Sequence, residues 1–134
     1  MVTDERNRTS FRSVLDDTVL DALGRFRGTS KPEFVDRVIT MYMETALILL
    51  AELKKGSANG DLATLHHASH ALKSCSATIG AGSLAARCEE LEAIARTGSV
   101  PDAPARVDAI AQEYRLVEAA LISRLAQPRT AQSP

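Results

Sequence analysis

Hydrophobic residues recur at intervals of three and four along most of the chain, which is the spacing of amphipathic helices that face a common core. The pattern predicts a short helix at about residues 17–26, then long helices at about 32–55, 62–79, 84–96 and 103–125. The inner positions expected in the first long helix are Phe34, Val38, Tyr42, Met43, Leu47, Leu50 and Leu53. Because short connections favour antiparallel neighbours, we predict an all-α fold, an antiparallel four-helix bundle with a short additional N-terminal helix.

Residues that begin and end helices separate these hydrophobic stretches. Residues 30–33, Ser-Lys-Pro-Glu, have the form of a capping box before the first long helix. Residues 56–60 are expected to form a turn, and Asp61 is expected to cap the next helix. The glycines of residues 80–82 interrupt that helix, and Ser83 is the expected cap of the helix that follows.

The composition fits one helical domain of a cytoplasmic protein. Hydrophobic residues make up 45% of the 134 residues but aromatic residues only 4%, so the core must be mainly aliphatic. The net charge of −1 gives no indication of a nucleic-acid partner, and no apolar run approaches the ~20 residues needed for membrane insertion. No signal-peptide pattern is present, and both cysteines lie at apolar positions. We expect a flexible arm at residues 1–13, the bundle at 14–126 and a flexible tail at 127–134.

The predicted helix at residues 62–79 carries all three histidines of the chain. At about 100° per residue, His70 falls in the middle of the face opposite the apolar stripe. The residues on this polar face are Ala63, His66, His67, His70, Lys73, Ser74 and Ala77. A histidine on the solvent side of a helix, with a lysine three residues later, is a candidate for chemistry rather than for packing.

The next helix places a carboxylate opposite this histidine. With a turn at residues 80–82, an antiparallel hairpin brings residues 91 and 92 level with His70. Leu91 belongs to the inner stripe, so Glu92 is expected at the seam, where its carboxylate can accept a hydrogen bond from Nδ1–H and leave Nε2 free. In the alternative interpretation, Glu92 is a solvated residue paired with Arg96 at i+4.

Three kinds of chemistry use an exposed histidine, namely hydrolysis, metal binding and phosphoryl transfer. Hydrolysis requires a nucleophile, a base and an oxyanion hole, and the sequence shows no such set. His66 and His70 have the spacing of a helical zinc pair, but no third ligand faces them. Phosphoryl transfer fits better, because imidazole accepts phosphoryl groups and Lys73 supplies positive charge one turn away. Any Mg²⁺ would then come from the partner protein, and we expect no intrinsic cofactor or metal site.

The residues around His70 resemble the signature of the histidine phosphotransfer (HPt) domain family. The signature is a histidine with an aliphatic residue two positions later, a lysine three later and a glycine ten later, followed by Leu-Glu in the next helix. The matching residues are His70, Leu72, Lys73, Gly80, Leu91 and Glu92. The preceding segment, from Pro32 to Asp61, also resembles the second helix of the family, so the likeness covers roughly residues 14–126.

The resemblance implies a function and a role for each matching residue. His70 would accept a phosphoryl group from a receiver-domain aspartate and pass it to another, with Lys73 beside the phosphoryl group. Gly80 would mark the helix end, and Glu92 matches the carboxylate that orients the histidine in chemotaxis-kinase phosphotransfer domains. Ser74 replaces the usual glycine, a small change that we expect transfer to survive. The docking residues would be Ala63, His66, His67, Ser74 and Ala77.

The partners implied are response-regulator receiver domains. The chain has no nucleotide-binding glycine-rich box, so we expect a phosphotransfer protein rather than a kinase, either free-standing or part of a hybrid sensor kinase. We expect a monomer. Two alternatives remain: an adaptor that binds a receiver without taking phosphate, and a metal-binding bundle that uses His66, His67 and His70.

Overall fold

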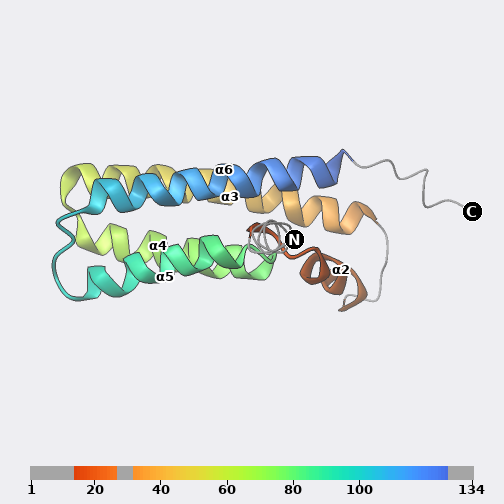
Figure 1. Ribbon diagram of the computed structural model, residues 1–134, viewed down its shortest axis with the longest axis horizontal. Helices are drawn as coiled ribbons and strands as arrows, with labels where there is room; N and C mark the ends of the chain where they lie inside the picture. The colour runs from red at the N-terminus through yellow and green to blue at the C-terminus, as the bar shows by residue number, and fades with distance from the viewer. Residues whose placement is uncertain (1–13, 27–31, 127–134) are drawn as a thin grey trace, which may run out of the picture.

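The computed structural model describes residues 14–26 and 32–126, and these residues form an antiparallel four-helix bundle with a short helix at one end (Figure 1). The elements are α2 (Asp17–Phe26), α3 (Pro32–Asn59), α4 (Leu62–Thr78), α5 (Gly82–Arg96) and α6 (Ala103–Leu125). Helices α3 and α6 lie side by side above the α4–α5 hairpin, and α2 lies near the turn of that hairpin (Figure 1). No strand occurs in the described ranges. The predicted all-α fold class is confirmed.

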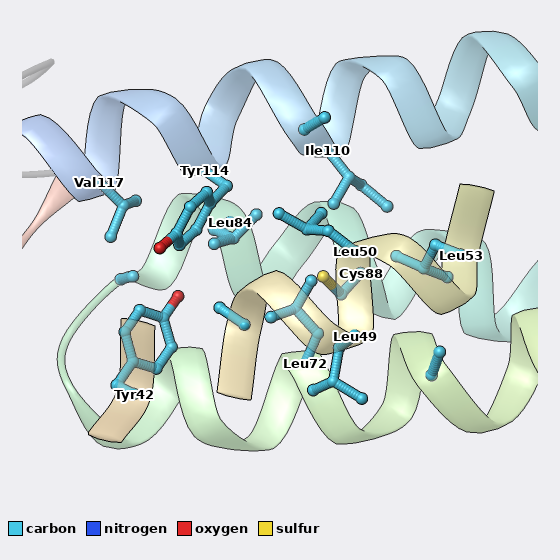
Figure 2. Close-up of a cluster of buried hydrophobic side chains, with 14 of the residues drawn as sticks. Tyr42, Leu49, Leu50, Leu53, Leu72, Leu84, Cys88, Ile110, Tyr114 and Val117 are labelled. Atoms are coloured by element: carbon cyan, nitrogen blue, oxygen red, sulfur yellow. The ribbon is translucent and has the colours of Figure 1, made fainter. Parts of the chain in front are cut away.

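The core is aliphatic, as the composition predicts, with two tyrosines at one level (Figure 2). The Tyr42 and Tyr114 rings lie 6.3 Å apart between centroids and join α3 to α6. The Tyr42 hydroxyl also forms a hydrogen bond of 2.8 Å with the buried hydroxyl of Ser76 on α4. Burial of large aliphatic side chains stabilises the fold by about 1.5–3 kcal/mol each. The buried face of α4 is thereby fixed against the rest of the bundle, which leaves its outer face in a defined orientation.

Both ends of α4 are set by local sequence. Asp61 caps its start, since the carboxylate accepts a 3.1 Å hydrogen bond from the Thr64 N–H, and this prediction is confirmed. Gly80 follows its end with a φ of +88°, a conformation that favours glycine. A Cβ atom at Gly80 would also lie 2.7 Å from the Asp16 carbonyl oxygen. Gly80 therefore ends α4 and lets the segment before α2 pack closely against the hairpin turn.

Three predicted details of the helices are wrong. Helix α3 continues through Asn59, because Gly56 keeps a helical backbone and Gly60, with a φ of +65°, provides the left-handed residue that ends the helix. Ser83 lies inside α5, which begins with Ala81 at its N-cap and no side-chain cap. Leu47 is 53% exposed, because it lies about 100° off the stripe that the structure buries. The buried stripe of α3 is Val35, Ile39, Tyr42, Ala46, Leu49, Leu50 and Leu53.

Several predictions fall on residues that the structure does not describe. The predicted arm at 1–13, the tail at 127–134 and the Ser30 cap all lie outside the described residues. Within the described part of the chain, no helix is both long enough and apolar enough to cross a membrane.

Candidate functional site

His70 projects from the middle of the outer face of α4. The His70 side chain is 57% exposed, whereas the other side of the same helix is buried. Ser69, the preceding residue, is buried, and its hydroxyl donates a 2.6 Å hydrogen bond to the Leu65 carbonyl one turn earlier. The ring of His70 therefore stands on a segment that the core holds in place.

Glu92 of α5 reaches this ring, as the hairpin register predicts. Its Oε2 atom lies 2.8 Å from Nδ1 of His70, although only 2% of the residue is exposed. Three of the side chains that bind this carboxylate, those of His70, Lys73 and Arg96, are themselves 57%, 27% and 65% exposed. The predicted contact between the two residues is confirmed, and the alternative interpretation of Glu92 as a solvated residue is wrong, although its pairing with Arg96 is present.

Two permanent cations share the same carboxylate. Lys73 lies with Nζ 2.8 Å from Oε1 of Glu92, and Arg96 lies with Nη2 3.1 Å from Oε2. The sequence offered Arg96 and His70 as competing partners of Glu92, but the structure brings both to the same oxygen. The ion pair of Lys73 with Glu92 was not predicted. Lys73 is thus engaged by the carboxylate rather than free in solvent.

These contacts fix the ionisation of Glu92 and the tautomer of His70. The hydrogen bond from Lys73, and after it the one from His70, lower the pKa of Glu92 from its ordinary value of 4.5 to about 2, against the opposing effect of burial. At neutral pH the carboxylate is therefore ionised and can only accept hydrogen bonds. Nδ1 of His70 must then be the donor. In the neutral ring Nε2 carries the lone pair, and this nitrogen has no hydrogen-bond partner among the described residues.

The other two histidines of α4 differ in their surroundings. Nε2 of His66 accepts a 3.3 Å hydrogen bond from Nε of Arg96 and lies 3.8 Å from Oε2 of Glu92. His67 is exposed and lines a separate hollow between α3 and α4. The contact of His66 with Arg96 was missed, although a signal for it exists in the sequence. The register that sets residue 92 opposite 70 also sets 96 opposite 66, four residues further from the turn.

Small residues surround His70 on the outer face of α4. Ala63, Ser74 and Ala77 are all exposed, as predicted for a docking face. Beyond Lys73, an open hollow of about 570 Å³ lies between α4 and α5. Its lining residues are Lys73, Ser74, Ala77, Thr78, Gly82, Ala85, Ala86 and Glu89. Another protein surface can approach the backbone of α4 closely here, because few long side chains stand in the way.

The described residues contain no group of three or more His, Cys, Asp or Glu side chains arranged to hold a metal ion. Nε2 of His66 is occupied by the hydrogen bond from Arg96, and Nδ1 of His70 by Glu92. No observation in the described ranges therefore favours the metal-binding alternative.

The comparison with known proteins agrees with this geometry. A family model described as the Hpt domain matches residues 37–120, which include His70, Lys73, Gly80 and Glu92. The chain belongs to the Hpt domain family. Its structure is also similar to the crystal structure of histidine-containing phosphotransfer protein B (HptB) from Pseudomonas aeruginosa PAO1, with a TM-score of 0.78 and 28% sequence identity. The similarity covers 87% of this chain and 97% of that one. The search of curated proteins found no match.

Family membership gives the general function of the chain. Hpt domains take part in histidine phosphotransfer within the phosphorelays of two-component signalling, and they carry the phosphoryl group rather than act as kinases. Their partners in these relays are response-regulator receiver domains. The resemblance inferred from the sequence is thereby confirmed.

Proposed function

We propose that His70 is the phosphoacceptor of this Hpt domain, that it receives the phosphoryl group from a receiver aspartate, and that it passes the group to a second receiver. The main support for this proposal is the position of the His70 ring, which is exposed and is held through Nδ1 by the Glu92 carboxylate. This arrangement leaves the unprotonated Nε2 free for attack. Among the residues that the structure describes, no carboxylate lies at hydrogen-bond distance from the ring of His66 or His67.

The transfer step can be written with the His70 ring and the aspartyl phosphate of the receiver as the reacting groups. The lone pair on Nε2 of His70 attacks phosphorus in the aspartyl phosphate of the receiver. The N–P bond forms as the bond between phosphorus and the aspartate oxygen breaks, and the aspartate leaves as a carboxylate. The ring retains its Nδ1 proton and becomes a cation, next to the ionised Glu92 at 2.8 Å. Transfer to the second receiver reverses these events, and the neutral ring is restored.

Lys73 and the receiver supply the remaining positive charge. The flexible stem of Lys73 lets its ammonium exchange Oε1 of Glu92 for a phosphoryl oxygen on the neighbouring His70 ring. Phosphoryl transfer also uses a divalent cation, and we expect Mg²⁺ to come from the receiver rather than from this chain. The docking face comprises exposed and partly exposed α4 residues around the ring, namely Ala63, His66, His67, Ser74 and Ala77.

The proposed relay function carries further expectations about the chain. It acts in the cytoplasm as a monomer, either as a free-standing carrier or as one part of a hybrid sensor kinase. The alternative function, an adaptor that binds a receiver without taking phosphate, predicts a complex without transfer. The two functions differ only in whether His70 takes the phosphoryl group.

Incubation with a panel of phosphorylated receiver domains tests the proposal. Acid-labile, alkali-stable label on the wild-type chain is expected, and His70→Gln should abolish it while helicity by circular dichroism stays unchanged, because the ring is exposed. His67→Gln is the matched control on the same exposed face and should keep its label. Label that persists in His70→Gln would refute the assignment. A stable receiver complex with no label on the wild type would support the adaptor instead.

A further inference from the structure

Arg96 joins two residues of the site through one edge of its guanidinium. Nε donates to Nε2 of His66 at 3.3 Å, and Nη2 donates to Oε2 of Glu92 at 3.1 Å. Arginine stays protonated in proteins, so both nitrogens must be donors. Nε2 of His66 is therefore an acceptor in this arrangement, and the ring proton lies on Nδ1. The fixed, planar fork of the guanidinium allows both bonds at once, which a lysine ammonium at this position would not match.

The contact with His66 gives Arg96 a defined position that its own helix does not provide. The Arg96 side chain is 65% exposed, and a single i,i+4 ion pair from such a side chain restricts it only weakly. A second hydrogen bond, made from α4 by the partly exposed His66, restricts the same guanidinium from another direction. Arg96 is thus held across the α4–α5 hairpin rather than free to rotate in solvent.

A held Arg96 matters when Lys73 changes its partner. Glu92 is covered, and before transfer it is neutralised on Oε1 by Lys73 and on Oε2 by Arg96. When Lys73 moves to the phosphoryl group, Arg96 is the permanent cation that remains on this carboxylate. Without Arg96, the His70 ring would be the one described group still bound to Glu92, and the carboxylate could rotate away and release Nδ1 of His70.

We propose that His66 is a positioning residue for the phosphoryl transfer, which holds Arg96 in place so that Glu92 keeps the His70 ring oriented while Lys73 turns to the phosphoryl group. This inference rests on the proposed function of His70. It gives His66 a role that docking alone does not require.

Two substitutions separate the hydrogen bond of His66 from its bulk. His66→Gln supplies an amide oxygen that can accept from Arg96, whereas His66→Leu has similar size and no acceptor. Transfer of label from a phosphorylated receiver should be slower by about threefold to tenfold in His66→Leu, the range for one partly exposed hydrogen bond, and nearly normal in His66→Gln. In an Arg96→Ala background, the additional substitution His66→Leu should not slow label transfer further. Arg115→Leu, which introduces the same side chain at an exposed position of α6 outside the docking face, is the control and should match the wild type.

Nuclear magnetic resonance gives a readout that does not depend on transfer. In the wild type and in His66→Gln, the Arg96 Nε–H signal should be protected from exchange and the His70 ring should be the Nδ1–H tautomer. In His66→Leu, the Arg96 Nε–H signal should lose its protection from exchange, and the Nδ1–H tautomer of His70 should be less populated. If His66→Leu matches an active wild type in rate and in both signals, the inference is overturned while the proposed function stands. If the wild type takes no label from any receiver, the proposed function fails, and the inference fails with it.

Discussion

Replacing Glu92 by glutamine separates the charge of this residue from its shape. The amide keeps one oxygen but replaces the other by an NH₂ group that only donates hydrogen bonds. In the wild type both oxygens accept, Oε1 from Lys73, and Oε2 from His70 and Arg96. The amide therefore leaves one of these donors facing another donor. If the NH₂ group faces Nδ1 of His70, that nitrogen must accept, the ring proton moves to Nε2, and the nucleophilic lone pair is lost.

The expected loss of rate follows from the charge that develops on the ring during transfer. Two unit charges about 4 Å apart attract by about 4 kcal/mol at an effective dielectric constant of about 20. Lys73 and Arg96 already share the charge of Glu92, so the smaller value of about 1.5–3 kcal/mol for a hydrogen bond to a charged group applies. Since about 1.36 kcal/mol corresponds to a factor of ten, Glu92→Gln should slow transfer about tenfold to a hundredfold.

Initial rates of label transfer from a phosphorylated receiver measure this loss, and ¹⁵N spectra of the His70 ring report its tautomer. Glu90→Gln is the matched control, because it makes the same chemical change on the same helix at a side chain that is 70% exposed. The control should transfer at the wild-type rate. A Glu92→Gln variant with the wild-type rate and an unchanged tautomer would refute the reasoning. Equal losses in the two variants would point to receiver binding instead of ring orientation.

Three further predictions concern charge and access. Because folding lowers the pKa of Glu92 from 4.5 to about 2, its contribution to stability should be fully present above pH 4.5 and lost as the pH falls toward 2. In urea unfolding, the stability difference between the wild type and Glu92→Gln should shrink over that range. Lys73→Ala should slow transfer about tenfold to a hundredfold, less at high salt, and an unchanged rate at low salt would exclude Lys73 from the phosphoryl site. Ala77→Arg should block transfer from every receiver, whereas Arg115→Tyr on the exposed side of α6 should not, and equal loss in both would mean that the receiver docks elsewhere.

The sequence predicts the bundle and the meeting of His70 with Glu92 because both depend mainly on backbone geometry. Asp61 and Gly80 set the ends of α4 through local conformations that few other residues supply. Once the hairpin turn is located, the antiparallel register decides which residues lie opposite one another, and alternate burial of neighbours such as Leu91 decides which side they face. The side chain of Glu92 has fewer rotatable bonds than a lysine or an arginine, so its carboxylate stays nearer to the position set by the backbone.

The longer side chains and the helix ends are less predictable. Lys73 and Arg96 reach Glu92 through several rotatable bonds, so their spacing permits the contacts without requiring them. From the sequence alone, Arg96 and His70 are alternative partners of Glu92. A carboxylate has two oxygens, however, and accepts from several donors at once. The end of α3 was misplaced for a related reason, because Gly56 is as compatible with a helix as with its termination, and only Gly60 takes the left-handed conformation.

The summed charge of His70, Lys73, Glu92 and Arg96, which together form a charged cluster, gives a reason for a carboxylate beside the histidine of a phosphoryl carrier. With neutral imidazoles, the one negative charge of Glu92 and the two positive charges of Lys73 and Arg96 leave a net charge of +1. A phosphoryl group brings about −2 and the ring cation +1, so the phosphorylated cluster is close to neutral. Without the carboxylate the same cations would face the phosphoryl group unopposed and would retain it. We therefore expect Glu92 to assist release as well as acceptance, which a relay carrier needs and a protein that only stores phosphate does not.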